Sequence, residues 1–359
     1  MNAANLAPAP RSVIERVMEI TYDVDGDVSF QNRARLSGLQ GNARSAIAEY
    51  LGAEPDEIAL VRNTSEANNI VIGGLELGVG DEVLLFDQNH ATNSVAWDVR
   101  GARYGFGVRR VGVPDGVDDP DEVRDAFLNA LRPETRVLAF SDISNVSGLR
   151  LPVRDICGAC RERGVYTHVD GAQSFGAVEV DLHELGCDSY ASSSHKWFMG
   201  PKEGGVLYVR AERIPEIWPH IVGVGWGSDV EPSAAGARKF ETLGQRNDAT
   251  LVGMGAAVEL HYSIGPDRIE ARIHELASHL VEGLRGIRGL RLVTPAAQAL
   301  RAGVVVARVE TDAGRRVYER LYEEHGIAGA ATGGLRLCPH IYNTREDVER
   351  AVEAVARLV

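Results

Sequence analysis

Short apolar runs rich in β-branched residues alternate with amphipathic helical stretches through residues 58–209, and this alternation restricts the fold more than any other feature. The strand-like runs lie at 58–61, 82–86, 136–140, 165–169, 189–191 and 205–209. Helical periodicity is found between them, at 65–73, 94–100, 120–131 and 154–162. Such alternation predicts an α/β fold, with a mostly parallel sheet between two layers of helices.

The pattern changes near residue 250. Helices are expected at 251–263, 267–284, 313–325 and 345–358, and strands at 290–293, 304–310 and 335–337. We therefore expect a large α/β domain over residues 14–250 and a smaller α+β domain formed by residues 1–13 and 251–359. No linker rich in Gly, Ser or Pro separates the two, so they should pack closely.

The charge balance excludes several classes of protein. The chain has 38 basic and 51 acidic residues, a net charge of -13, and no basic block. This argues against nucleic acid or an anionic membrane as a partner. No apolar run approaches the roughly 18 residues of a membrane span, and the N-terminus lacks the basic and apolar regions of a signal peptide. We expect a cytoplasmic protein.

The cysteines and histidines give no metal-binding pattern. Cys157 and Cys160 have CxxC spacing, but the chain holds no second pair, and Cys160 falls at helical spacing with apolar residues. His274 and His279 are five residues apart, whereas the zinc motif HExxH needs four. We therefore expect Cys160 to pack in the core, and no metal site.

A lysine in an unusual setting and an aspartate at a strand end carry the main chemical signal. Lys196 follows Ser192–His195 and precedes an apolar Trp-Phe-Met turn, while Asp170 directly follows the run at 165–169. Burial lowers the pKa of a lysine and makes its amine nucleophilic. Pyridoxal phosphate (PLP) needs such a lysine for its aldehyde and a carboxylate that keeps its ring nitrogen protonated. A surface lysine and a helix-capping aspartate are the alternatives.

Hydroxyl groups are placed to bind a phosphate. Thr64 and Ser65 follow the first strand and open a helix, whose N-terminus favours anions. Ser193 and His195 flank the lysine. A plain capping box at Thr64 is an alternative that does not exclude phosphate binding.

Three polar residues after strand ends complete the candidate site. His90 follows the strand at 82–86 and can stack on a flat heterocycle, Gln173 can donate to a ring oxygen, and Asn145 can touch a ring hydroxyl or a substrate carboxylate. A loop histidine and a turn asparagine are the alternatives. Ligands in open α/β sheets bind beyond the carboxyl ends of the strands, where Asp87, Ser141, Asp170 and Ser192 are expected to converge.

Taken together, these residues resemble the class V aminotransferase family of fold-type I PLP enzymes. Its members include cysteine desulfurases, selenocysteine lyase, isopenicillin N epimerase-like proteins and several C–S lyases. The likeness covers nearly the whole chain, from an opening similar to the family's at 2–13 to the signature-like run at 336–344. The resemblance implies PLP as cofactor and an amino acid as substrate.

The resemblance also implies a role for each residue. Lys196 would carry the cofactor and shuttle protons, and Asp170 would pair with the ring nitrogen. Gln173 would bind the ring hydroxyl, and His90 would stack on the ring. The phosphate would be held by Thr64, Ser65, Ser193 and His195.

Arg336 matches the arginine that grips the substrate's α-carboxylate, for which a guanidinium fork is suited. A surface salt bridge is its alternative. Family members are usually homodimers in which a Gly-Thr segment of the partner reaches the phosphate. Gln245 stands here where threonine is usual. The resemblance therefore implies a homodimer with a shared active site, but the contact of this segment with the phosphate differs from that of the family.

One departure narrows the reaction. Better-known desulfurases carry a catalytic cysteine in the loop before the C-terminal arginine, and the loop at 326–334 has none. Cys338 lies on the signature strand, a poor place for a mobile sulfur carrier. We expect an aminotransferase or a C–S lyase that works through an external aldimine and a Cα carbanion. An epimerase or racemase and a decarboxylase are alternatives, a desulfurase is disfavoured, and a non-catalytic binding module is least favoured.

Overall fold

The computed structural model describes residues 1–114, 116–223, 236–310 and 314–359. Within them, seven strands form a large sheet in the order β1-β7-β6-β5-β4-β2-β3. The strands are β1 (Ile58–Val61), β2 (Glu82–Phe86), β3 (Gly107–Val111), β4 (Thr135–Ser141), β5 (Tyr166–Asp170), β6 (Ser189–Ser193) and β7 (Gly205–Val209). Parallel pairing joins β3, β2, β4, β5 and β6, and only β7 runs against its neighbours. The expected mostly parallel α/β sheet is confirmed.

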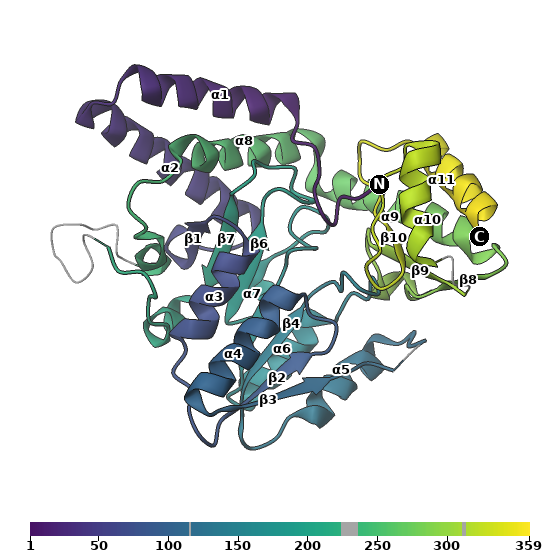
Figure 1. Cartoon of the computed structure of the whole chain (residues 1–359). Coiled ribbons are helices and arrows are strands. Elements are labelled where there is room, and N and C mark those ends of the chain that lie inside the picture. Colours follow the sequence, from purple (N-terminus) through teal and green to yellow (C-terminus); the bar gives the residue numbers. More distant parts are fainter. Residues whose placement is uncertain (115, 224–235, 311–313) are drawn as a thin grey trace.

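Helices cover both faces of this sheet (Figure 1). One face packs against α3 (Thr64–Gly74) and α4 (Val95–Tyr104), which contribute buried residues such as Val71 and Trp97. The other packs against α5 (Pro120–Ala130) and α6 (Val153–Glu162), and α7 (Leu182–Leu185) adds a buried leucine there. The strands β1, β2 and β7 are rich in Val, Leu and Ile because every residue in them is buried, whichever face of the sheet it points to.

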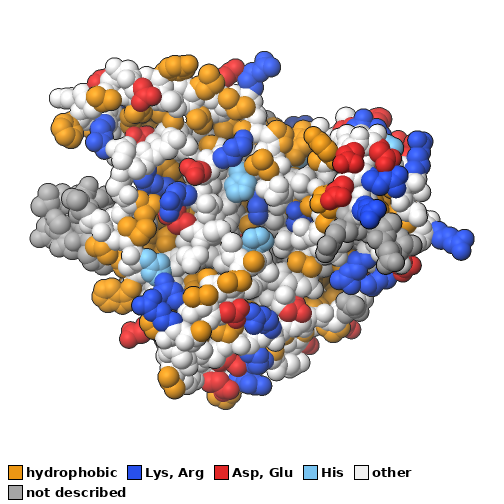
Figure 2. Space-filling view, viewed as in Figure 1, with side chains coloured by type: hydrophobic (Ala, Val, Ile, Leu, Met, Phe, Trp, Pro, Cys, Tyr) orange, Lys and Arg blue, Asp and Glu red, His pale blue; other side chains and the backbone are white. Residues whose placement is uncertain are grey.

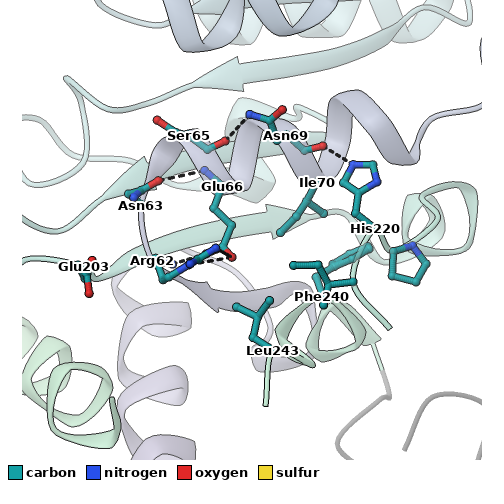
Figure 3. A pocket seen from close by; sticks show the side chains of 12 residues that line it. Arg62, Asn63, Ser65, Glu66, Asn69, Ile70, Glu203, His220, Phe240 and Leu243 are labelled. Carbon is teal, nitrogen blue, oxygen red and sulfur yellow. Dashed lines mark hydrogen bonds and ion pairs between the residues drawn. The ribbon is translucent and has the colours of Figure 1, made fainter. Parts of the chain in front are cut away.

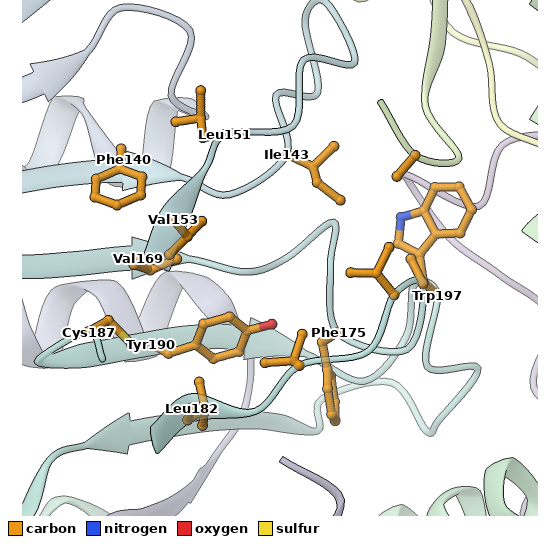
Figure 4. Packing of buried hydrophobic residues seen from close by; sticks show 14 of the residues in the cluster. Phe140, Ile143, Leu151, Val153, Val169, Phe175, Leu182, Cys187, Tyr190 and Trp197 are labelled. Carbon is orange, nitrogen blue, oxygen red and sulfur yellow. The ribbon is translucent and has the colours of Figure 1, made fainter. Parts of the chain in front are cut away.

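The buried apolar side chains on the α5 and α6 face form a cluster that reaches from the sheet to the loop that contains Lys196. Figure 4 shows Val169 and Tyr190 on neighbouring strands, with Phe175 and Trp197 beyond the strand ends. Cys157, Cys160 and Cys187 are buried in the same cluster, and the core position predicted for Cys160 is confirmed.

A smaller antiparallel sheet, in the order β10-β9-β8, follows in the C-terminal part of the described chain. Its strands are β8 (Leu290–Leu292), β9 (Val305–Val309) and β10 (Leu335–Leu337), and its helices are α9 (Pro266–Arg285), α10 (Gly314–His325) and α11 (Arg345–Leu358). The N-terminus lies beside these elements, because Asn2 bridges to Cys338 (Figure 1). Position 313, the predicted start of α10, lies outside the described residues.

A helical layer formed by α1 (Arg11–Gly26), α2 (Phe30–Tyr50) and α8 (Asp248–Ile264) lies to one side of the large sheet (Figure 1). Leu251 of α8 is buried in the cluster of the large sheet, whereas the sequence analysis assigned it to the small domain; the domain boundaries stay a prediction. No helix in the described ranges combines the length and apolar character that crossing a membrane requires.

Four of these elements, α1, α2, the short α7 and β3, were not predicted from the sequence. The edge strand β3 carries Arg109 and Arg110, and Arg109 donates from Nε and Nη2 to the two carboxylate oxygens of Glu82, each at 2.8 Å. In α2 the buried face includes small residues such as Ala43, which lies against Gly255 of α8. Neither β3 nor α2 therefore shows the broad apolar pattern on which sequence prediction depends.

Candidate active site

The chain places its predicted polar residues at one edge of the large sheet. Because β1, β2, β4, β5 and β6 all run in the same direction, the segments that follow them leave the sheet at the same edge. Ser193 on β6 and Val61 on β1 both pair with Gly205, so the segments after β1 and β6 begin side by side. Figure 2 shows a hollowed face in which histidine and basic side chains gather.

Thr64 and Ser193 form the first contact at this edge. The Ser193 Oγ accepts a hydrogen bond from the Thr64 backbone N at 2.7 Å, and the two hydroxyl oxygens lie 2.5 Å apart. The helix cap is Asn63, whose side chain accepts from the Glu66 N at 3.0 Å, so the capping-box alternative at Thr64 is wrong. The Thr64 hydroxyl instead faces the segment that leads to the predicted lysine.

Asp170 is a buried carboxylate, 3% exposed. Its Oδ2 accepts from Asn68 Nδ2 and its Oδ1 from the Ala172 N, each at 3.1 Å. In the described part of the chain no lysine, arginine or histidine forms an ion pair with it. A buried charge without a counter-charge is costly, so a protonated ring nitrogen would fit this site.

Lys196 lies in the segment after β6 and is half-buried. Burial lowers the pKa of its amine, the charge of Asp170 raises it, and Arg336 lowers it again. No other group in the described ranges forms a hydrogen bond with this amine. A lysine with a lowered pKa and a free amine is suited to attack an aldehyde.

The loop after Lys196 contains two strained residues and is closed by a backbone hydrogen bond. Met199 and Glu203 have positive φ angles of 54° and 60°, a backbone region that is unfavourable for residues other than glycine. The Ser194 N donates to the Gly204 O at 2.9 Å, which closes the loop. The position of the lysine is therefore set by its neighbours.

Arg336 and Asn145 meet at the junction of the two sheets. They are 5% and 8% exposed, and Arg336 Nη1 donates to the Asn145 backbone O at 3.2 Å. Arg336 Nε and Asn145 Oδ1 are buried, and the described residues offer neither atom a partner. The surface salt bridge considered for Arg336 is therefore wrong. The two unpartnered atoms fit a ligand that supplies both acceptors and donors, such as an amino acid.

His90 lies in the segment after β2 and is exposed. Its Nδ1 bonds the Thr92 hydroxyl at 3.0 Å. Partial burial of the ring and the charge of Lys196 lower its pKa, whereas Asp170 raises it. His90 is thus within electrostatic reach of both residues, and its ring is open for stacking.

The remaining predicted residues differ in their contacts. Gln173 is buried, with its Nε2 donating to the Ala4 O at 3.0 Å and its Oε1 accepting from Trp197 Nε1 at 2.8 Å. Burial lowers the pKa of His195 to about 4, so its ring is neutral at pH 7. Ser65 is half-buried at the start of α3.

Gln245 is not brought together with the other predicted residues. It is exposed, and its side chain bonds Arg33 of α2 at 3.0 Å and the Arg246 backbone O at 3.0 Å. This placement leaves its implied role toward a partner subunit as a prediction.

Two residues connected to Asp170 in the structure, Asn68 and His168, are not recognisable as site residues from the sequence. Asn68 donates to the carboxylate of Asp170, and His168 Nε2 lies 3.0 Å from Asn68 Oδ1. The available signals were weak: Asn68 is one helical turn after Thr64, and His168 is a titratable side chain within a run that otherwise reads as a buried strand.

A cavity of about 430 Å³ adjoins the N-terminus of α3. Figure 3 shows Ser65 and Asn69 along one side of it, with the His220 ring against the Asn69 backbone. Arg62 faces the same cavity but is paired with Glu66 at 2.9 Å. Ser65 is therefore the hydroxyl residue of this helix start that lines the cavity, together with the carboxylates of Glu66 and Glu203.

The sheet, the free lysine amine and the unpaired buried carboxylate at its edge are the arrangement of a PLP-dependent enzyme. Comparison with known proteins identifies the family. Residues 2–352 match the family described as Aminotransferase class-V. The chain therefore belongs to the class V aminotransferases, which depend on PLP, and the expected family, cofactor and enzymatic character are confirmed.

The relatives differ in reaction. Over its whole length the chain is 34% identical to an isopenicillin N epimerase of Amycolatopsis lactamdurans, of which it covers 94%. It is 31% identical to a probable cysteine desulfurase of Xylella fastidiosa, over 88% of this chain and 79% of that protein. A solved structure of the cystine C-S lyase C-DES with its product cysteine persulfide matches 99% of this chain and 96% of that chain, with 27% identity and a TM-score of 0.91.

Proposed function

We propose that the protein is a C–S lyase that removes the Cα proton of an amino acid and expels a sulfur-bearing group from Cβ. The observation that carries this proposal is the amine of Lys196, which is free of hydrogen bonds among the described residues and lies within the electrostatic influence of Asp170 and Arg336. A neutral amine in this setting is a suitable base for an acidified Cα–H. The similarity to a cystine C-S lyase supports the elimination step.

Asp170 and the hydroxyl groups at the sheet edge would hold the cofactor. When bound, PLP supplies an aldehyde for the lysine and a ring that accepts the electron pair released at Cα. Asp170 keeps the ring nitrogen protonated, and His90 covers the ring. The phosphate is bound by Thr64, Ser65, Ser193 and His195, with the N-terminus of α3 favouring its charge.

Arg336 and Asn145 would hold the substrate. The buried guanidinium binds the α-carboxylate, and the side chain of Asn145 orients it. Lys196 Nζ takes the Cα proton, the Cβ–S bond breaks, and the sulfur leaves with the bonding electron pair. The protonated Nζ of Lys196 can then return a proton to the leaving sulfur.

The thiols support a reaction without a cysteine carrier. All four cysteines are free and buried. Burial raises the pKa of Cys338, and only part of this rise is offset by Arg336. A buried thiol with a raised pKa is a poor nucleophile. The sulfur would therefore leave the enzyme with the product instead of passing to a cysteine.

Epimerisation at Cα is a second candidate, favoured by the identity to isopenicillin N epimerase. It would begin with the same proton transfer to Lys196 and end with return of a proton on the opposite face of Cα. Transamination, the other reaction expected from the sequence, would instead return the proton to the cofactor. The three outcomes share their first step and differ in their products.

We also propose a homodimer located in the cytoplasm. Ile14, Met18 and Tyr22 of α1 are about half to three-quarters exposed, and Phe30 at the start of α2 is exposed as well. Figure 2 shows apolar side chains along this helical layer. An exposed apolar row of this kind is typical of a subunit interface. The four reduced thiols agree with a cytoplasmic protein.

The proposal is tested first by the visible spectrum of the purified protein, followed by borohydride reduction and peptide mapping. A chromophore trapped on Lys196 is expected, and Lys196→Ala should fold but lose it together with all turnover. L-Cystine and S-substituted cysteines should then give pyruvate, whereas alanine should not. Racemised substrate in deuterated solvent without pyruvate would favour the epimerase. A 2-oxo acid that keeps the substrate's side chain would favour transamination. A protein that stays colourless with added PLP would refute the proposed PLP-dependent activity.

A further inference from the structure

Asp170 is the last member of a buried chain of hydrogen bonds. Ser189 Oγ lies 2.8 Å from His168 Nδ1, His168 Nε2 lies 3.0 Å from Asn68 Oδ1, and Asn68 Nδ2 donates to Asp170 Oδ2 at 3.1 Å. Ser189, His168 and Asn68 are fully buried. They come from β6, β5 and α3, so the chain links three elements of the fold.

The fold explains why these side chains meet. His168 and Asp170 are two residues apart on β5, and alternate side chains of a strand point to the same face. This face is covered by α3, which brings Asn68 over both residues. Asn68 thereby bridges two side chains of β5 that are too far along the strand to bond each other directly.

The direction of each hydrogen bond follows from its partners. An ionised Asp170 only accepts, so the Asn68 group that faces it is the NH₂, and Asn68 Oδ1 must accept from His168. His168 Nε2 therefore carries the proton, and Nδ1 accepts from the Ser189 hydroxyl. Burial lowers the pKa of His168 to about 3, which agrees with a neutral ring that has one donor and one acceptor. All three donors thus point toward the carboxylate.

A buried histidine with both nitrogens bonded can be purely structural. Here, however, every donor is oriented toward one carboxylate, and hydrogen bonds in series strengthen one another at low dielectric. We propose that Asn68 and His168 are positioning residues that keep Asp170 ionised and aimed at the ring nitrogen of the cofactor. The inference rests on the proposed role of Asp170. Its consequence is that the proton shared between carboxylate and ring stays on the ring.

The test compares Asn68→Ala with Asn69→Ala. Asn69 is the next residue on α3 and is exposed, and among the described residues its side chain bonds only the Ser65 backbone O of its own helix. The measurements are the dissociation constant of PLP and the ¹⁵N resonance of PLP labelled at its ring nitrogen. Asn68→Ala should weaken PLP binding about tenfold, the effect of one hydrogen bond to a charged group. Its ¹⁵N signal should move toward the unprotonated position, while Asn69→Ala stays within about twofold of wild type.

Ser189→Ala provides a milder variant, because it removes only the hydroxyl at the far end of the chain. A smaller ¹⁵N shift in the same direction is expected, with a modest fall in the melting temperature of the apo protein because His168 Nδ1 loses its donor. If Asn68→Ala does not fold, this variant decides the question. A wild-type ¹⁵N position in the folded variants would overturn the inference.

The two proposals fail in different ways. Wild-type protein that takes up no PLP on Lys196 would defeat the proposed function. Asp170→Ala serves as the reference for the ring nitrogen. If Asp170→Ala moves the ¹⁵N resonance and both Asn68→Ala and Ser189→Ala leave it unchanged, only the positioning role of the buried chain is wrong.

Discussion

The indole of Trp197 donates its Nε1–H to Oε1 of Gln173 at 2.8 Å, and this bond connects the loop that contains Lys196 to the turn after Asp170. Trp197 is fully buried, and its ring stacks on His340 with centroids 5.5 Å apart. The position of Lys196 relative to Asp170 therefore depends on a hydrogen bond that neither residue makes itself.

Replacement of this indole should weaken PLP binding as well as lower the stability of the fold. Trp197→Phe keeps an aromatic ring but leaves Gln173 Oε1 buried without its donor, at a cost of about 1–3 kcal/mol. Trp97→Phe is a matched control, because Trp97 is also fully buried and donates to Asn93 at 3.3 Å. Thermal denaturation should show a loss in both variants. Only Trp197→Phe should weaken PLP binding. Equal PLP affinities in the two variants would show that the hydrogen bond between Trp197 and Gln173 does not position the site.

Arg336 should determine the affinity for the substrate's carboxylate and leave the cofactor in place. Arg336→Lys retains the charge but loses the planar fork, so KM for an amino acid should rise about tenfold or more while the PLP spectrum is unchanged. The exposed Arg308, whose Nε bonds the Gly333 O at 3.1 Å, gives the control Arg308→Lys.

An amino-acid amide sharpens this test, because it lacks the carboxylate. Wild type and Arg336→Lys should process the amide with similar kcat/KM. If Arg336→Lys prefers the amino acid over its amide as strongly as wild type does, another group binds the carboxylate.

The thiols should be dispensable. Burial raises the pKa of Cys160 to about 12 and raises that of Cys338 as well. Cys338→Ala should therefore retain activity within about twofold, and iodoacetamide should label the native protein slowly compared with the denatured protein. A loss of more than tenfold, or a persulfide found on Cys338 by mass spectrometry, would point to a cysteine carrier.

Much of the fold could be predicted from the sequence because its signals are local. The runs at 58–61, 82–86 and 205–209 coincide with β1, β2 and β7, since strands buried on both faces are continuously apolar. The edge strand β3 was missed because it carries arginines among its apolar residues. The helix α2 was missed because its contacts include small residues.

Of the candidate site, only the residues next to recognisable strand ends could be predicted from the sequence. Asp170 and Lys196 stand next to recognisable strands, so the sequence alone places both side chains at one edge of the sheet. The partners of Asp170 could not be predicted, because Asn68 lies 102 residues away in the chain and bonds it only once α3 has packed on β5. The bond between Trp197 and Gln173 likewise depends on tertiary packing.

Acid should destabilise the fold through His340, which bonds the backbone of the lysine loop. Its Nε2 donates to the Trp197 O at 2.9 Å and its Nδ1 accepts from the Ile341 N at 2.7 Å, so the ring must be neutral. Burial lowers its pKa to about 4, against 6.5 for a free histidine. Between these values the unfolded state binds more protons than the folded state. Stability therefore falls as the pH drops from about 6.5 toward 4.

The loss attributable to this histidine should reach about 2 kcal/mol at pH 5 relative to pH 8, since one pKa unit corresponds to about 1.4 kcal/mol. His340→Gln removes the titration but keeps a donor for the Trp197 carbonyl. Urea unfolding of the apo protein at pH 5, 6.5 and 8 measures the effect. The variant should be less stable than wild type at pH 8 and should lose less of its stability on acidification. Equal losses in the two proteins would show that another group is responsible for the acid sensitivity.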